Sequence, residues 1–324
     1  MDGRGFLRVT IVAAFIALCL PIRTGADTRF PEFESIKPNV AFWLTVYSRY
    51  TTSQAIIHDS RRLDIIYDVI DVRPYDAPGA RKVNRSLTKR AKAKYETILA
   101  QLAADPDASA PEARRVKGLF GADATPNDFR NARNRVRSQI GQKDRFRAGL
   151  MRSGAYIDQI RAIFSAYGLP EKLAYLPHVE SSFDLKAYSK FGAAGIWQFT
   201  RSTGRRFMTV GYVLDERRDP IAATHGAAKL LKENFEKLGS WPLAITAYNH
   251  GAAGMARAKR AHGGYPRIFD AYRSRSFKFA SRNFYSEFLA ASRIAADPTA
   301  YFGTLQFEKP VRYRTVTLGG YASL

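Results

Sequence analysis

The residues of this chain best suited to chemistry lie between Leu173 and Gln198. Glu180 falls at the end of a short apolar helix, which we expect from Pro170 to Ser181 because apolar side chains recur there at helical spacing. An acid beside an apolar stripe loses hydration, which raises its pKa and keeps it protonated near neutral pH, as a general acid needs. The alternative is an ordinary, partly exposed glutamate in the last turn of a helix.

Two glycine-containing segments each combine an aromatic side chain with an amide. Residues 192–198 read GAAGIWQ, and glycine lets the backbone approach a ligand closely and adopt positive φ. Residues 247–251 read AYNHG and end another expected helix at a glycine. Aromatic faces stack on sugar rings, and amides hydrogen-bond hydroxyl and N-acetyl groups. Together with one acid, these residue types predict a site for a sugar polymer.

Four motifs in order resemble those of the lytic transglycosylases, the lysozyme-like enzymes that cleave peptidoglycan, and in particular the membrane-bound murein transglycosylase D group. They are Glu180-Ser181, the GxxQ turn that ends at Gln198, the triplet from Ala247 to Asn249, and Tyr285 within the segment NFYSEFL. The resemblance covers roughly residues 156–296. It departs at the turn, which reads Gly-Ile-Trp-Gln where many members have Gly-Leu-Met-Gln.

The resemblance implies a mechanism that needs one acid. Glu180 would protonate the oxygen of the β-1,4 bond between N-acetylmuramic acid and N-acetylglucosamine, and its carboxylate would then take the proton of the muramyl C6 hydroxyl. The product would be a 1,6-anhydromuramyl end, formed without water. The motif positions imply that Ser181 and Gln198 hold the acid or the sugar, and that three residues contact the substrate and tune Glu180: Tyr248, Asn249 and Tyr285.

Two other functions stay open. Glycoside hydrolysis ordinarily uses two carboxylates, about 5 Å apart in retaining enzymes and about 6.5 to 9.5 Å apart in inverting ones. The nearest second acid is Asp184, which we interpret as structural because the helix ends before it. A lysozyme-like hydrolase would give reducing ends rather than anhydro ends. A glycan-binding scaffold would keep its wall binding after loss of Glu180.

We expect neither a cofactor nor a metal. No HExxH motif or other compact ligand spacing occurs among the five histidines, which are His58, His178, His225, His250 and His262. No serine or cysteine triad and no GxxxxGK phosphate loop is recognisable.

The first 26 residues predict a secretory signal peptide. Arg4 and Arg8 precede an apolar run, residues 9–20, that is too short to cross a membrane comfortably. Cys19 follows Leu18 instead of the small residue that a lipobox favours, so we expect no lipid anchor. The protein is therefore expected to be exported to the periplasm or cell envelope, where it would have no cysteine left for a disulfide.

The strongly basic composition predicts an anionic partner or surface. The formal net charge is +22, and residues 81–152 hold 18 Lys and Arg against 7 Asp and Glu. Nucleic acid is not expected, because no reading helix, zinc finger or aromatic sheet platform is recognisable. The expected partners are peptidoglycan glycan strands, with peripheral contact to anionic membrane or cell-wall components. The sequence does not predict the oligomeric state or whether the basic region binds the wall or a partner.

The expected fold is mainly α. Residues 1–26 are the signal peptide, 27–152 a basic and mostly helical N-terminal extension, and 153–300 the catalytic domain; 301–324 form a tail with a short strand at 311–318. The resemblance implies that the catalytic domain is lysozyme-like, of the goose-type or soluble lytic transglycosylase (SLT) kind. In the extension we expect a helix over 86–103, and a capped helix from Thr125 whose apolar face includes Phe129, Val136 and Ile140.

Overall fold

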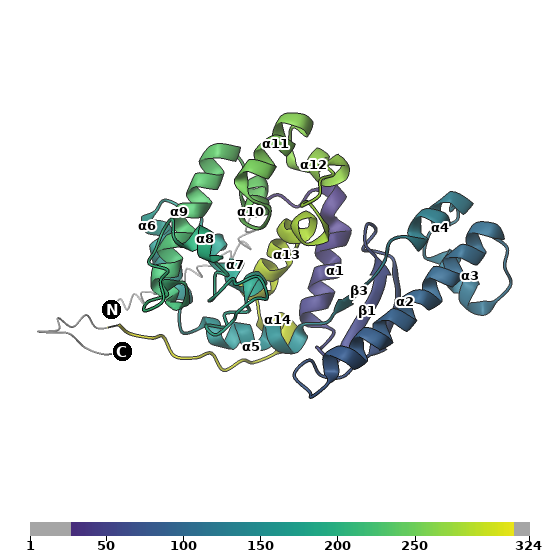
Figure 1. The fold of residues 1–324 in the computed structure, drawn as a ribbon, viewed down its shortest axis with the longest axis horizontal. Helices are drawn as coiled ribbons and strands as arrows, with labels where there is room; N and C mark the ends of the chain where they lie inside the picture. The colour runs from purple at the N-terminus through teal and green to yellow at the C-terminus, as the bar shows by residue number, and fades with distance from the viewer. Residues whose placement is uncertain (1–26, 314–324) are drawn as a thin grey trace, which may run out of the picture.

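The computed structural model describes residues 27–313. The expected signal peptide, residues 1–26, lies outside the described residues, as does most of the expected C-terminal strand, from residue 314 on. Residues 311–313 form no strand. The prediction of a mainly α fold is confirmed, since helices run through most of the described chain and the strands are short (Figure 1).

Most of the helices pack into one helical body, made of α1 and residues 143–302 (Figure 1). Its elements are α1 (Lys37–Ser48), α5 (Lys143–Ser153), α6 (Ile157–Ala166), α7 (Leu176–Glu180), α8 (Arg201–Gly204), α9 (Pro220–Leu238), α10 (Trp241–His250), α11 (Ala252–His262), α12 (Tyr265–Ala271), α13 (Phe279–Ala296) and α14 (Thr299–Phe302). Helix α13 runs through the middle of the body, where its apolar residues are buried against α1, α7 and α10. The helices that carry the sequence motifs therefore share one continuous core.

Residues 54–140 form a smaller unit beside the body, here called the small domain. It consists of a three-stranded antiparallel sheet, in the order β2-β1-β3, and of one long helix and two short ones that lie between β2 and β3 in the sequence. The elements are β1 (Gln54–Asp59), β2 (Ile66–Asp71), α2 (Ala80–Ala104), α3 (Pro111–Gly118), α4 (Pro126–Arg133) and β3 (Val136–Ile140). Figure 1 shows α2, α3 and α4 projecting away from the body on the far side of the strands.

Strand β1 joins the two units, because alternate residues of a strand face opposite sides of its sheet. Ile56 is buried in the core of the helical body, whereas Ile57 is buried in the separate core of the small domain. Both side chains are fully buried. The residues expected to form one N-terminal extension thus divide between two cores, with α1 and residues 30–48 packed into the body.

The segment after Thr125 differs from the prediction. Helix α4 has the expected capping box, in which Thr125 and Asp128 bond each other's backbone N–H groups, but it ends at Arg133. Val136 and Ile140 belong instead to β3, which pairs antiparallel with β1. Their spacing of four fits a helix as well as a strand, and β1, which decides the outcome by pairing, lies about 80 residues away in the sequence. The expected helix over 86–103 is confirmed within α2.

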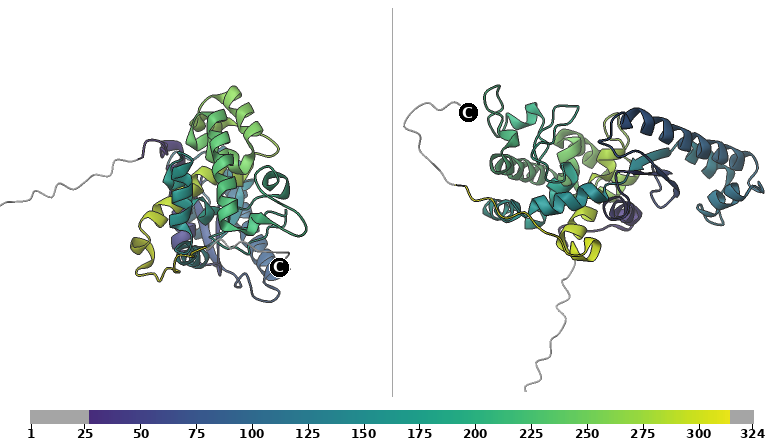
Figure 2. Two further views of the ribbon diagram at one scale, coloured as in Figure 1. Left: turned by 90° about the vertical axis from the view of Figure 1, so that its left-hand side faces the viewer. Right: turned by 90° about the horizontal axis from the view of Figure 1, so that it is seen from below.

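The described tail crosses the outside of the body (Figure 2). Its backbone donates from Glu308 to the carbonyl of Met151 at 2.8 Å and from Val311 to that of Ala155 at 3.1 Å. These bonds fix the end of α5 and the start of α6, the elements that precede the helix of Glu180.

Candidate active site

Glu180 is the last residue of α7, and its side chain lines a cavity of about 690 Å³. Pro177 in the first turn sets the start of this short helix, and Leu176 and His178 bury one side of it. The other lining residues come from the small domain's loop, α5, and the segment after Glu180: Tyr75, Gln142, Asp144, Arg145, Ala148, Arg152, Val179, Ser181, Ser182, Asp184, Lys186, Ala187, Tyr188, Ser189 and Gln198. Glu180 is therefore placed where a bound polymer could reach it.

The carboxyl of Glu180 favours its protonated form. Burial, and to a lesser extent the negative charge of Glu287, raise its pKa from the usual 4.5 to about 8. No basic side chain forms an ion pair with Glu180 within residues 27–313. The direction of the shift agrees with the sequence prediction, and it suits a group that donates a proton near neutral pH.

Glu287 is a second carboxyl beside the site that the sequence reasoning missed. It lies on α13, which packs against α7, and it accepts a hydrogen bond from the Tyr47 hydroxyl at 3.4 Å. Burial raises its pKa as well, against the opposing effects of Tyr47 and Arg137. The signal that could have found it is an acid inside the otherwise apolar run NFYSEFLAA. When two carboxyl groups lie close together, the negative charge of one disfavours ionisation of the other, so both stay protonated to higher pH.

The turn after Glu180 is held in an uncommon backbone conformation. Ser182 and Phe183 both have positive φ, 53° and 56°. The guanidinium of Arg152 donates twice to the Ser182 carbonyl, from Nε at 3.2 Å and from Nη2 at 2.7 Å. Gly149 faces this turn so closely that a Cβ would lie 2.8 Å from the same carbonyl oxygen. Strained backbone at a lining segment is typical of a functional site and persists only when its surroundings fix it.

The GxxQ turn is fixed next to that segment. Gly195 has φ +74°, and a Cβ there would lie 1.9 Å from the carbonyl oxygen of Arg217, so only glycine fits. Gln198, at φ 50°, donates from Nε2 to the Gly195 carbonyl at 2.9 Å. Ser181 Oγ donates to the carbonyl of Ile196 at 2.9 Å. The structure thus brings Ser181 and Gln198 together with Glu180 at one cavity, and their side chains tie the two turns to each other.

Tyr248 lies beside Glu180, and Asn249 is exposed next to it. The Tyr248 hydroxyl donates to the Trp197 carbonyl at 2.8 Å. Burial, and then the charge of Glu180, raise the pKa of Tyr248 above its usual value. Asn249 accepts from Ser281 Oγ at 2.7 Å. Trp197 itself is fully buried and donates to Thr224, so this departure from Gly-Leu-Met-Gln fills the core and does not line the cavity.

The structure places Tyr285 away from this group. Its side chain is fully buried, its hydroxyl donates to the Pro31 carbonyl at 2.9 Å, and its ring packs against Tyr265. The preceding residue, Phe284, is also buried, and its ring stacks on that of Tyr248 at 6.5 Å between centroids. On a helix, adjacent residues point about 100° apart, so Phe284 and not Tyr285 contacts Tyr248.

The histidine nearest to the site in sequence belongs to the core. His178 is buried among aromatic rings, 5.2 Å from Phe146 and 4.6 Å from Phe183 between centroids, and burial lowers its pKa to about 3. Within residues 27–313, no group of three or more His, Cys, Asp or Glu side chains could hold a metal ion. The same part of the chain has no helix long and apolar enough to cross a bilayer.

Comparison of this chain with known proteins supports the resemblance drawn from the motifs. Residues 159–268 match the family model described as the Transglycosylase SLT domain, so this segment carries such a domain and the resemblance predicted from the motifs is confirmed. The chain is 37% identical over 113 residues to membrane-bound lytic murein transglycosylase D of Escherichia coli (strain K12), a match covering 33% of this chain and 24% of that protein.

Two further similarities have lower sequence identity. A putative tributyltin chloride resistance protein of Alteromonas sp. (strain M-1) is 32% identical over 109 residues, 33% of this chain and 53% of the relative. The chain thus spans about half or less of the length of these relatives. Among solved structures, the lytic transglycosylase Slt inactive mutant E503Q from Pseudomonas aeruginosa matches with a TM-score of 0.38 and 15% identity, over 69% of this chain and 34% of that one.

Proposed function

We propose that this protein is an exported lytic transglycosylase that cleaves peptidoglycan glycan strands, with Glu180 as its general acid and base. The observation that carries the proposal is a glutamate whose pKa is raised to about 8 at the cavity of a segment that matches the SLT domain. Such a group is protonated at neutral pH and lies open to a polymer.

The proposed reaction uses the Glu180 carboxyl twice, first as an acid and then as a base. Glu180 donates it to the glycosidic oxygen between N-acetylmuramic acid and N-acetylglucosamine while the bond from that oxygen to the muramyl C1 breaks. The resulting carboxylate takes the proton of the C6 hydroxyl as O6 bonds to C1, which closes the 1,6-anhydro ring and restores the acid. No water enters. A raised pKa suits both steps, because it makes Glu180 a competent acid and its carboxylate a competent base.

The surrounding residues are proposed to support Glu180 in different ways. Ser181 and Gln198 hold the two turns that border the acid, Tyr248 packs beside it, and the exposed Asn249 is free to contact the sugar. For Tyr285, its hydrogen bond to Pro31 favours an indirect role, in which it anchors the N-terminal segment to α13.

A hydrolase on the same scaffold is the second candidate, and one observation favours it. Asp184 lines the same cavity as Glu180, where it could orient water. Its Oδ1 already accepts from the backbone N–H of Lys186 at 2.9 Å, which gives it a local structural role and leaves the transglycosylase the better supported reaction.

The test is mass analysis of the fragments that the purified protein and its Glu180→Gln variant release from peptidoglycan. The proposal expects anhydro-ended fragments from the parent, one water lighter than hydrolytic products, and none from the variant. Reducing ends would identify the hydrolase. Wall binding by both proteins without release by either would identify a glycan-binding scaffold.

A further inference from the structure

The small domain contributes one side chain directly to the cavity of Glu180. Tyr75 lies in the loop between β2 and α2, outside the matched residues 159–268, and it lines the cavity together with residues of α5. Its side chain is 64% exposed. A large aromatic ring left open to solvent within a cavity is a surface on which an apolar ligand face can stack.

The positively charged side chain of Arg145 packs against the ring of Tyr75. The guanidinium carbon of Arg145, on α5, lies 4.5 Å from the centre of the Tyr75 ring, within the range of a cation–π contact. This contact joins the small domain to the helical body at the cavity's edge. It also limits the positions that the ring can take, which lowers the entropy lost when a ligand stacks on it.

The positive charge of Arg145 is available to bind an anionic group of a ligand. Within residues 27–313 Arg145 forms no ion pair, and the neighbouring carboxylate, Asp144, accepts hydrogen bonds from Thr52, from the backbone N–H at 2.9 Å and from the hydroxyl at 2.5 Å. An exposed guanidinium beside an exposed ring matches a ligand that pairs an apolar sugar face with a carboxylate.

We propose that Tyr75 and Arg145 form a saccharide-binding position, in which the ring of Tyr75 stacks on an N-acetylhexosamine unit and Arg145 binds a carboxylate carried by that unit or its neighbour. This inference rests on the proposed function, since it takes the glycan strand to be the ligand. It assigns the small domain a part in substrate binding, while the chemistry stays with Glu180 in the body.

The test measures binding in the Glu180→Gln background, where no strand can be cut. Isothermal titration would use two soluble probes: a neutral β-1,4-linked N-acetylglucosamine oligomer, and glycan strands freed of peptides, which keep the lactyl carboxylates of muramic acid. Tyr75→Ala is expected to weaken both probes by about 3- to 10-fold. Tyr75→Phe keeps the stacking ring and is expected to stay within about twofold of the parent.

Two further variants separate the parts of the proposal. Arg145→Gln is expected to weaken the acidic strands by up to about fivefold, and more than the neutral oligomer, because it removes an exposed charge pair. Tyr212→Ala is the matched control, since Tyr212 is fully exposed and does not line the cavity. It is expected to bind both probes as the parent does.

Equal affinity of Tyr75→Ala and the Tyr212→Ala control for both probes would overturn the proposed position, as would a parent that binds neither probe. These results are distinct from a failure of the proposed function. Anhydro-ended products from the wild type, together with binding independent of Tyr75, would remove this inference alone. Binding that depends on Tyr75, without any cleavage by the wild type, would remove the catalytic proposal alone.

Discussion

Two glutamates of this protein, one in each unit, have pKa values that their surroundings shift in opposite directions. Glu180 in the helical body has its pKa raised to about 8 by burial and by the charge of Glu287. Glu112 on α3 of the small domain has its pKa lowered to about 2, first by the hydrogen bonds from Arg115 and then by that from Tyr95. The same side chain is thus kept neutral in one unit and charged in the other.

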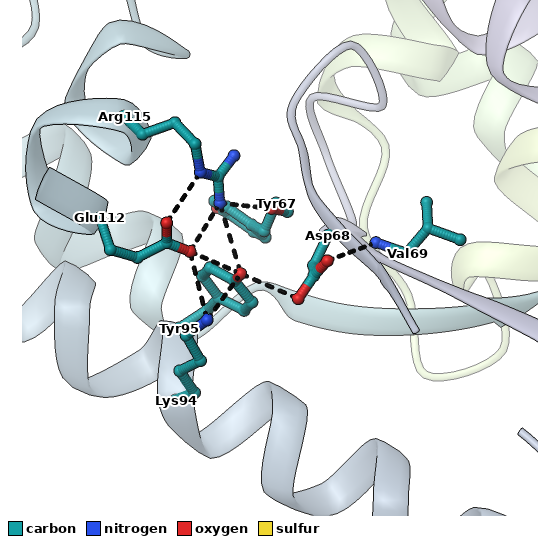
Figure 3. Close-up of polar contacts among 7 residues, drawn as sticks. All are labelled: Tyr67, Asp68, Val69, Lys94, Tyr95, Glu112 and Arg115. Atoms are coloured by element: carbon teal, nitrogen blue, oxygen red, sulfur yellow. Dashed lines mark hydrogen bonds and ion pairs between the residues drawn. The ribbon is translucent and has the colours of Figure 1, made fainter. Parts of the chain in front are cut away.

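The setting of Glu112 is a polar cluster that joins three elements of the small domain (Figure 3). Arg115 donates to both oxygens of Glu112, at 3.0 Å and 2.9 Å, and to the backbone carbonyl of Tyr67 at 2.6 Å. The Tyr95 hydroxyl lies within hydrogen-bond distance of Glu112 and of Asp68. Every acceptor in this cluster has a donor, so the cluster stabilises the packing of β2, α2 and α3 and leaves no proton to transfer. Within residues 27–313, no basic side chain pairs with Glu180, and burial raises its pKa and favours the protonated form.

The largest expected effect is on cleavage. Glu180→Gln is expected to lower the rate of release of glycan fragments by at least about 100-fold, because the amide can neither donate nor accept the proton at neutral pH. The matched variant Glu112→Gln is expected to leave the rate within about twofold. Dye release from labelled peptidoglycan would measure both. Equal loss in the two variants would mean that Glu180 acts only through folding.

A second pair of variants contrasts the backbone of the two units. Gly195 and Gly79, the latter preceding α2, have nearly the same φ, +74° and +73°. A Cβ at Gly195 would meet Arg217, whereas none of the described atoms lies within 4 Å of one at Gly79. Gly195→Ala is expected to cost about 3 kcal/mol or more and to impair cleavage, and Gly79→Ala about 1 kcal/mol. Urea denaturation would measure the free energy of unfolding of both variants. Equal losses would mean that the structure relaxes around the new Cβ at residue 195 and relieves its contact with Arg217.

The charge of Glu287 offers a third test. Glu287→Gln removes a negative neighbour of Glu180, so the pKa of Glu180 is expected to fall and the alkaline limb of the pH–rate profile to move down by about one pH unit. The control is Glu236→Gln, on the exposed face of α9. A profile unchanged from that of the control would show that burial alone raises the pKa of Glu180.

The smallest expected effect is on stability, and its sign differs between the two glutamates. Glu180 has a folded pKa above its usual 4.5, so its contribution is present at low pH and lost as the pH rises through about 8. Glu112 has a folded pKa below 4.5, so its contribution is present above that value and lost as the pH falls toward 2. At pH 8, Glu180→Gln is expected to raise the free energy of unfolding, and Glu112→Gln to lower it, each by about 1 kcal/mol. Thermal unfolding of both variants across this range would check the opposite slopes.

Much of this site could be predicted from local patterns. The helix of Glu180, its apolar side and the neighbouring turns are set by residues close together in the sequence, where helical periodicity and glycine signals apply. Glu287 could not be found in this way, because its proximity to Glu180 depends on how α13 packs against α7. Likewise, whether Phe284 or Tyr285 contacts Tyr248 is decided by the rotation of α13 in the core.

The small domain was less predictable for the same reason. A sheet depends on pairing between distant segments, and β3 meets β1 only after the whole of α2, α3 and α4 has intervened. Tyr75 gave no signal of a role at the cavity, since its place there depends on how the small domain lies against α5. Pattern reasoning therefore located the local segments of the candidate site better than the contacts between distant segments that surround it.

The most direct test of the central claim is cleavage of purified peptidoglycan in ¹⁸O-labelled water, followed by mass analysis of the new muramyl ends. If Glu180 gives its proton to the glycosidic oxygen and then takes the proton of the muramyl C6 hydroxyl, the new ends are anhydro forms that contain no ¹⁸O. Reducing ends that carry one ¹⁸O would show that water attacks C1, and would contradict the transglycosylase.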